Sequence, residues 1–167
     1  MHAALCITGF MGAGKTTVAR VLAGELARPF IDLDRFIHTH THRTPQQIID
    51  TDGEAMFRRI ETENLRRVLA ETGLPVVALG GGAWTIEANR ALIAEYGAVS
   101  VWLDASFDLC WERIHRTART RPFARDRAAA EKLFMNRQPL YRLAALHVPV
   151  TEKDDAAHIA RRIITAL

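Results

Sequence analysis

Gly9-Phe10-Met11-Gly12-Ala13-Gly14-Lys15-Thr16 fits the phosphate-binding pattern G-x-x-x-x-G-K-[ST], and an apolar run at residues 3–7 comes directly before it. In a loop of this kind, glycines let backbone N–H groups turn inward around phosphates, the lysine reaches the β- and γ-phosphates, and the hydroxyl coordinates magnesium. Residues 17–28 carry apolar side chains at helical spacing, so the loop would lie between a strand and a helix whose N-terminus faces the anion. A chance glycine-rich turn is the alternative, and the order of strand, loop and helix argues against it. The nucleotide-binding residues predicted at this loop are Gly12, Ala13, Gly14, Lys15, Thr16 and Thr17.

Five short and mostly continuous apolar runs predict the strands of the fold: residues 4–8, 30–32, 76–79, 99–103 and 147–151. Continuous apolar strands are typical of parallel sheets that are covered on both faces. Helical patterns separate them, at about residues 15–27, 45–51, 54–71, 86–96, 106–116, 128–143 and 155–166. This alternation predicts an α/β fold with a doubly wound five-stranded parallel sheet, flanking helices and right-handed crossovers. Since 167 residues are an ordinary size for one domain and no linker interrupts them, we expect a single domain over residues 1–167.

The composition excludes several classes of protein. The chain is 49% hydrophobic and 25% charged, which is ordinary for a globular protein that buries a full core. No run approaches the roughly 18 apolar residues of a membrane-spanning helix, and the first residues lack the pattern of a signal peptide. We therefore expect a cytoplasmic protein without membrane contact. Cys6 and Cys110 lie in apolar surroundings without a second cysteine at metal or redox spacing, so both are predicted to be reduced core residues.

Two segments are longer than a connection between strand and helix needs. Residues 33–62 contain an Asp-Gly turn and the start of an amphipathic helix, and residues 112–127 include a stretch of weak apolar periodicity around Pro122 that is typical of kinase lids. The net charge is only +3, yet six arginines fall between residues 113 and 127. They fit a nucleic-acid patch, a solvated helix face or a clamp over nucleotide phosphates. We expect no nucleic-acid binding, because aromatic residues for base stacking are not interleaved with them.

Four segments in chain order resemble the shikimate kinase family: GFMGAGKT at 9–16, FIDLD at 30–34, LGGGA at 79–83 and NRQPLY at 136–141. The phosphate loop alone is shared by many unrelated NTPases, whereas the triple glycine and the Arg-x-Pro-Leu-Tyr segment are much narrower. The resemblance implies a fold like that of nucleoside-monophosphate kinases, with ATP and Mg²⁺ as cofactors. It also implies transfer of the γ-phosphoryl group to the 3-hydroxyl of shikimate, in aromatic amino acid biosynthesis, with a substrate-binding insertion at 33–62 and a lid at 112–127.

Two carboxylates at the end of the second strand are candidates for catalysis and metal binding. By resemblance, Asp34 contacts the ring hydroxyls and orients or deprotonates the acceptor, at the edge where α/β sheets bind ligands. Asp32 would point the same way, because strand side chains alternate with period two. Thr16 and, through bound water, Asp32 form the predicted magnesium site. A helix N-cap with a solvated neighbour is the alternative for the two carboxylates.

A carboxylated acceptor requires cations, and a guanidinium can hold a carboxylate with two parallel hydrogen bonds. Arg58 and Arg137 match the family at such positions, with Phe57 beside Arg58 in the predicted pocket. A helix-surface arginine is the alternative for both, and for Arg58 the residues Glu54 and Glu61 stand at ion-pair spacing.

The triple glycine is the predicted backbone surface for the substrate. Gly80, Gly81 and Gly82 follow an apolar strand, at a place where a ligand can approach the backbone closely. We expect a backbone hydrogen bond from Gly81 to the substrate. A purely conformational role of the glycines is the alternative.

Arginines of the lid are expected to contact the nucleotide. By resemblance, Arg121 before Pro122 closes over the transferring phosphate and stabilises its charge. The predicted catalytic residues are Lys15, Asp34 and Arg121. Arg113 and Arg116 are both candidates for stacking on adenine, and the sequence does not choose between them.

Some positions depart from the family pattern and leave the acceptor preference less defined than the reaction. Phe123 stands in the segment after Arg-Pro where leucines are usual, and Ile49 lies near a position where an aromatic residue often lines the pocket. His38 and His42 would share a helix face at a spacing used by metal ligands, but we expect a solvated polar helix end, because no carboxylate or Cys completes a metal site nearby.

Two other functions fit a phosphate-loop pocket of this kind. A kinase of another small polyol acid such as gluconate shares the fold, but the GGGA and RQPLY segments argue against it. A metabolite-sensing module would keep the pocket without turnover, but these 167 residues leave no room for an output domain. We expect a monomeric enzyme whose partners are ATP and shikimate.

Overall fold

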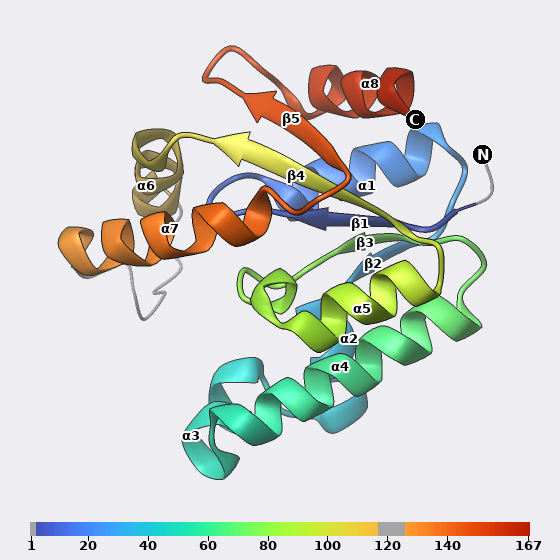
Figure 1. Cartoon of the computed structure of the whole chain (residues 1–167), viewed down its shortest axis with the longest axis vertical. Coiled ribbons are helices and arrows are strands. Elements are labelled where there is room, and N and C mark those ends of the chain that lie inside the picture. Colours follow the sequence, from blue (N-terminus) through green and yellow to red (C-terminus); the bar gives the residue numbers. More distant parts are fainter. Residues whose placement is uncertain (1–2, 117–125) are drawn as a thin grey trace.

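The computed structural model describes residues 3–116 and 126–167, and its helices and strands alternate along the chain (Figure 1). Within these ranges no helix is long and apolar enough to span a membrane. In chain order the elements are β1 (Leu5–Thr8), α1 (Lys15–Glu25), β2 (Phe30–Asp32), α2 (Leu33–Thr41), α3 (Pro45–Asp52), α4 (Glu54–Glu71), β3 (Val76–Ala78), the 3₁₀ helix η1 (Ala83–Thr85), α5 (Glu87–Glu95), β4 (Val99–Ala105), α6 (Phe107–Arg116), α7 (Arg127–Tyr141), β5 (Leu146–Val150) and α8 (Ala156–Ala166).

The five strands form one parallel sheet in the order β2-β3-β1-β4-β5. The chain crosses from β1 towards one edge and later returns past it towards the other, and because crossovers are right-handed, helices come to lie on both faces. Helices α1 and α8 pack together on one face, and α4 and α5 pack together on the other (Figure 1). The predicted doubly wound α/β fold is therefore confirmed. Each predicted strand is present, and its bounds differ from the prediction by about two residues at most.

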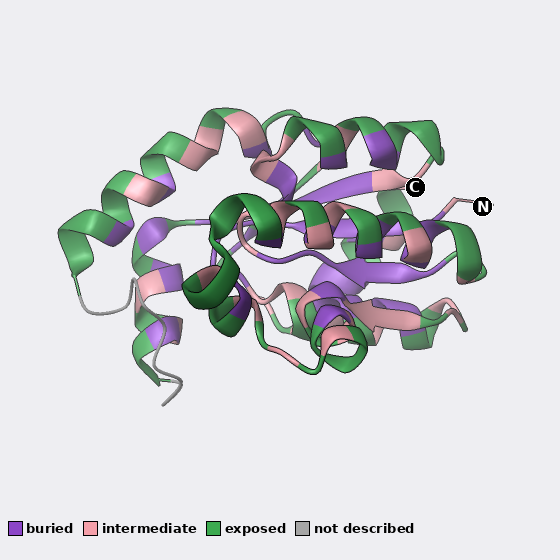
Figure 2. Cartoon of the chain, turned by 90° about the horizontal axis from the view of Figure 1, so that it is seen from below, coloured by how far each residue is buried: buried purple, intermediate pink, exposed green. Residues whose placement is uncertain are grey.

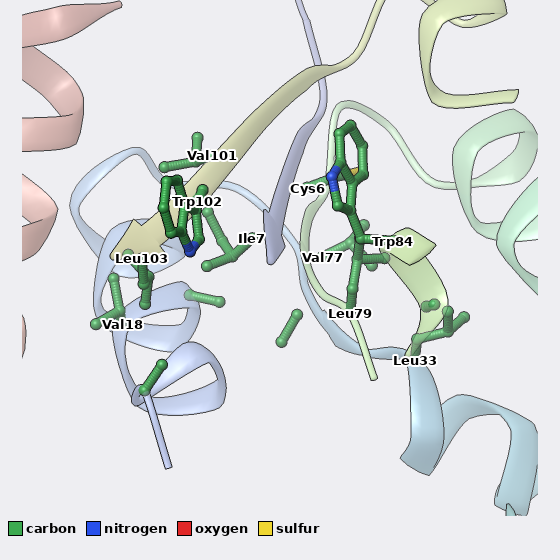
Figure 3. Packing of buried hydrophobic residues seen from close by; sticks show 14 of the residues in the cluster. Cys6, Ile7, Val18, Leu33, Val77, Leu79, Trp84, Val101, Trp102 and Leu103 are labelled. Atoms are coloured by element: carbon green, nitrogen blue, oxygen red, sulfur yellow. The ribbon is translucent and has the colours of Figure 1, made fainter. Parts of the chain in front are cut away.

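The core lies on both sides of the sheet, as the continuous apolar strands predict. Ile7, Val77 and Leu103 of three different strands are each at most 1% exposed (Figure 3). The helices turn buried residues towards the sheet and exposed residues outwards (Figure 2). On β4, the indole of Trp102 stacks on the ring of Tyr141 with a centroid distance of 6.2 Å, which joins the sheet to the end of α7.

Both cysteines are free thiols in this core, as predicted. Burial raises the pKa of Cys6 to about 12 and that of Cys110 to about 11. The two thiols therefore stay protonated at neutral pH and are poor nucleophiles.

Three helices, α2, α3 and α4, fill the segment between β2 and β3. The prediction left residues 33–41 without a helix, and this is wrong. Helix α2 begins directly after β2 because the side chain of Asp32 accepts a hydrogen bond from the backbone N–H of Arg35 and caps the first turn. The buried residues of this helix are only Leu33 and Ile37, which gives too short an apolar pattern to recognise.

The histidines at the end of α2 lie in solvent. The helix ends at Thr41, and His42 follows as its C-cap with a left-handed φ of 56°. The backbone N–H of His42 bonds to the carbonyl of His38 one turn earlier, and both residues are exposed, which fits the solvated polar helix end expected from the sequence.

Candidate active site

The phosphate loop lies between the end of β1 and the start of α1 (Figure 1). Gly14 has a φ of 96°, in the left-handed region that favours glycine, and it is the N-cap of α1. Lys15 is the first residue of this helix, and its Nζ donates a hydrogen bond to the carbonyl of Phe10 at 2.9 Å. The lysine thus folds over the loop, next to a helix N-terminus that attracts anions.

A cleft of about 580 Å³ opens beside this loop. It is lined by Gly12, Ala13, Gly14, Lys15, Thr16, Thr17, Val18, Arg20, Asp32, Arg113, Asp154, Ala156 and Ile159. All six residues predicted from the phosphate loop are among them. The prediction missed three lining residues that follow the last strand, Asp154, Ala156 and Ile159. The predicted strand at 147–151 could have indicated them, because ligands bind past the carboxyl ends of parallel strands.

Thr16 and Asp32 meet in this cleft. The hydroxyl of Thr16 donates to Oδ2 of Asp32 at 2.9 Å, while Oδ1 accepts from the backbone N–H of Arg35 at 3.2 Å. Asp32 therefore caps α2 with one oxygen, which was the alternative read from the sequence, and faces the phosphate loop with the other. Hydroxyl and carboxylate oxygens suit Mg²⁺, which usually keeps waters and phosphate ligands beside one or two carboxylates. The pair fits a nucleotide-bound magnesium ion, although no three His, Cys, Asp or Glu residues gather into a metal site in the described part of the chain.

Asp34 lies just past the end of β2, as expected, but it does not point the same way as Asp32. It lies in the first turn of α2 rather than on the strand, so the alternation argument that would align it with Asp32 is wrong. A Cβ added at Gly80 would lie only 2.7 Å from Oδ1 of Asp34. The carboxylate of Asp34 therefore lies against the triple glycine, whereas Asp32 faces Thr16.

Arg58 lies against the third glycine in the same manner. A Cβ added at Gly82 would lie 2.6 Å from Nη2 of Arg58. The backbone of Gly82 has a φ of −104°, which any residue can adopt. A side chain at this position would therefore displace the guanidinium of Arg58, whereas the backbone conformation by itself would accept one.

Two glutamates hold the guanidinium of Arg58 in place. Nη1 donates to Oε2 of Glu61 at 2.9 Å and Nη2 donates to Oε1 of Glu54 at 3.2 Å. The ion pairs that were the alternative for Arg58 are therefore present, but Glu61 is 1% exposed and anchors the arginine from inside the protein. Burial raises the pKa of Glu61, and Arg58 opposes this rise. Phe57 is buried as well, with its ring centroid 5.1 Å from Cζ of Arg58, so it supports Arg58 from the core.

Arg137 reaches the middle glycine from α7. Its Nη1 donates to the carbonyl of Gly81 at 3.1 Å, and the hydroxyl of Tyr141 donates to the same carbonyl at 2.8 Å. A Cβ added at Gly81 would lie 4.0 Å from the backbone N of Met11 in the phosphate loop. Three charged side chains from three helices therefore gather around three consecutive glycines, directly beside the phosphate loop.

The structure distinguishes the two arginines at the end of α6. Nη1 of Arg113 lies 3.5 Å from the carbonyl of Ala13 in the phosphate loop, and Arg113 lines the cleft. Arg116 is exposed and forms an ion pair with Glu112. Arg113 is thus the one placed to contact a nucleotide. Arg121 lies outside the described residues, as does most of the predicted lid.

Comparison with known proteins shows the family to which this chain belongs. The family model for shikimate kinase matches residues 11–167. The shikimate kinase of Ruegeria pomeroyi is 40% identical over 100% of this chain and 86% of its own length. The chain belongs to the shikimate kinase family. A second shikimate kinase, from Mesorhizobium japonicum, is 38% identical over 98% of this chain and 80% of its own length, and the resemblance inferred from the sequence is confirmed.

Solved structures of shikimate kinases share the fold closely. The enzyme from Acinetobacter baumannii, in complex with shikimate, has a TM-score of 0.86 at 33% identity, over 98% of this chain and 92% of that one. The shikimate kinase of Bacteroides thetaiotaomicron has a TM-score of 0.87 at 27% identity, over 99% of both chains. A gluconokinase from Sinorhizobium meliloti reaches 0.66 at 19% identity, over 98% of this chain and 90% of that one, which shows a shared fold alone.

Sequence reasoning did not assign a role to some residues around the shikimate kinase site. Glu61 entered only as a surface partner of Arg58, and Asn89 on α5 was not considered. Both are buried polar residues, and nothing in their local sequence sets them apart from the exposed polar residues of the same helices. Tyr141 was part of a quoted motif, but only the fold shows that its hydroxyl reaches the carbonyl of Gly81.

Proposed function

We propose that this chain transfers the γ-phosphoryl group of ATP to the 3-hydroxyl of shikimate. The observation that carries the proposal is the gathering of Asp34, Arg58 and Arg137 around the triple glycine. This site adjoins the phosphate loop, since a Cβ at Gly81 would lie 4.0 Å from the backbone of Met11. Adjacent sites for donor and acceptor are what direct transfer between two bound substrates requires.

The phosphate side would neutralise charge. Backbone N–H groups of the loop and the N-terminus of α1 would bind the phosphates, and Lys15 would exchange the carbonyl of Phe10 for phosphate oxygens. Thr16 and Asp32 would hold Mg²⁺, which neutralises phosphate charge when bound. Arg113 would contact the nucleotide from the wall of the cleft.

The acceptor side would orient the substrate. Arg58 and Arg137 would hold its carboxylate, and the backbone of Gly81 would add a hydrogen bond. Asp34 would accept a hydrogen bond from the 3-hydroxyl and take its proton while the oxygen attacks the γ-phosphorus. The bond between this phosphorus and the bridging oxygen of ADP then breaks, and ADP leaves.

We extend the proposal to one kinase domain over residues 1–167 that acts as a monomer in the cytoplasm. Residues 33–62 would bind the substrate, and residues 112–127 would form a lid from which Arg121 reaches the transferring phosphate. Membership of the shikimate kinase family favours shikimate over gluconate. The presence of residues with proposed roles in the transfer step, Lys15, Thr16, Asp32, Asp34 and Arg121, favours turnover over sensing.

The test is ADP release by the purified protein with ATP and Mg²⁺, with shikimate, quinate, gluconate or no acceptor in parallel. We expect release that depends on shikimate. Turnover with gluconate or quinate alone would reassign the pocket. ATP binding without turnover on any acceptor would contradict the kinase activity and favour the sensing module.

A further inference from the structure

Asn89, on α5, is a buried amide next to the acceptor site, with an exposed fraction of 0%. Its Nδ2 donates to the carbonyl of Ala83 at 2.9 Å and, over a longer 3.5 Å, to Oε2 of Glu61. Its Oδ1 accepts from the hydroxyl of Thr62 at 2.6 Å. Because both partners of Nδ2 are acceptors and the partner of Oδ1 is a donor, the amide has only one orientation that satisfies all three.

These partners belong to two parts of the acceptor site. Ala83 directly follows the triple glycine, and its carbonyl marks the end of that turn. Oε2 of Glu61 is the same oxygen that accepts from Arg58. A single amide on α5 thus connects the glycine turn to the carboxylate that anchors Arg58.

The amide of Asn89 is an uncharged hydrogen-bond donor that helps to keep the buried carboxylate of Glu61 ionised. Glu61 faces Arg58 on its own helix, Asp34 on α2 and the amide of Asn89 on α5. Burial is the main cause that raises the pKa of Glu61, and the negative charge of Asp34 adds to the rise. Arg58 and the Asn89 amide lower it, so both favour the ionised carboxylate.

We propose that Asn89 is a positioning residue for the acceptor: by joining Glu61 to the end of the triple glycine, it sets where the guanidinium of Arg58 lies against Gly82. The inference rests on the proposed function, because its effect is measured on shikimate. Asn89 acts through Glu61 and Arg58 and has no role on the phosphate side. Its loss should therefore change KM for shikimate and leave KM for ATP as it is.

Asn89→Asp tests this by replacing the donor with a carboxyl group of the same shape. At low pH the introduced carboxyl and Glu61 share a proton, since two carboxylates this close do not both ionise easily, and this single proton keeps the link to Glu61 while the carbonyl of Ala83 loses its donor. As pH rises the proton is lost, the two carboxylates repel each other, and Arg58 loses its fixed anchor. We expect KM for shikimate to be raised only about twofold at about pH 6 and about tenfold at about pH 8.5, with KM for ATP unchanged at both.

Two further variants separate charge from packing. Asn89→Ala removes the donor without adding a charge, so its rise in KM for shikimate should not grow towards pH 8.5 as that of Asn89→Asp does. Asn64→Asp is the matched control, because Asn64 is also buried, at 6% exposed, and its Nδ2 donates only to the carbonyl of Ile60 on the same helix. It should keep the wild-type dependence of KM on pH.

The outcomes are distinct for the two proposals. Wild-type protein without turnover on shikimate would overturn the proposed function. Active wild-type protein with an unchanged KM for shikimate in both Asn89 variants would overturn the positioning role alone. So would an equal rise in KM for shikimate and ATP, or failure of both variants to fold, since each would mark Asn89 as a structural residue only.

Discussion

Replacement of Gly82 by alanine should weaken shikimate binding while the fold stays intact. The added Cβ would lie 2.6 Å from Nη2, 3.1 Å from Nη1 and 3.2 Å from Cζ of Arg58. Carbon atoms in favourable contact are about 3.5–4.0 Å apart, so the guanidinium has to move by most of an ångström. The backbone at Gly82 has a φ of −104° and a ψ of −12°, which alanine can adopt. We therefore expect the side chain of Arg58 to move and the backbone at Gly82 to stay in place.

A movement of this size disrupts the 2.9 Å hydrogen bond between Arg58 and Glu61 and takes the guanidinium away from the substrate carboxylate. Hydrogen bonds to charged groups contribute about 1.5–3 kcal/mol. We therefore expect kcat/KM for shikimate to fall by about 10- to 150-fold, through a higher KM. Coupled detection of ADP release at varied shikimate measures this, and the same assay at varied ATP should give the wild-type KM.

Gly24→Ala on α1 is the control, because nothing lies within 4 Å of its added Cβ. This variant should keep wild-type kinetics and be at least as stable to heat as the wild type, since alanine favours the helix more than glycine does. A folded Gly82→Ala protein with the wild-type KM for shikimate would refute the reasoning, because it would show that the position of Arg58 beside the glycine does not matter for binding.

Other variants test the remaining parts of the site. Arg137→Ala should raise KM for shikimate by about 10- to 150-fold at constant KM for ATP, and a loss confined to ATP affinity would contradict its assignment to the acceptor. Tyr141→Phe removes one of two donors to the carbonyl of the middle glycine and should raise KM for shikimate by only about 2- to 10-fold in the same assay. Lys15→Ala should lower kcat by about 100-fold or more with any acceptor, and single-turnover kinetics would show whether the transfer step itself is slowed. Arg113→Ala should raise KM for ATP about tenfold, from the loss of one charge-assisted contact. The exposed Arg116→Ala is its control, and an equal effect of both would contradict the placement of Arg113 in the cleft.

Most of the fold could be predicted because its signals are local. The phosphate loop, the apolar strands and the amphipathic helices each lie within one short segment of the sequence. Residues 33–41 were missed because the helix is started by a cap, Asp32, and buries only Leu33 and Ile37. The prediction did not include the segment after β5 in the cleft, because Asp154 does not belong to any recognisable sequence motif.

The site could be predicted only in part, since it depends on contacts between distant helices. The spacing of Arg58 from Glu54 and Glu61 indicated ion pairs on a helix surface, and the structure contains both ion pairs. It also places Arg58 against Gly82, a contact that sequence spacing cannot reveal. Resemblance to the family supplied Arg137 and Asp34. The roles of Glu61 and Asn89 could not be predicted, because the burial of a polar side chain depends on tertiary packing and leaves no local pattern in the sequence.

The contacts of the triple glycine also limit how this site can change in evolution. Any larger residue at position 80 or 82 displaces the side chain of Asp34 or Arg58, so each glycine is constrained as long as its charged neighbour has to keep its place. New acceptor specificity on this scaffold would then require paired substitutions at positions far apart in the sequence. We expect that divergent relatives which have lost one of these glycines have also changed its charged neighbour, and that single substitutions at these sites are removed by selection.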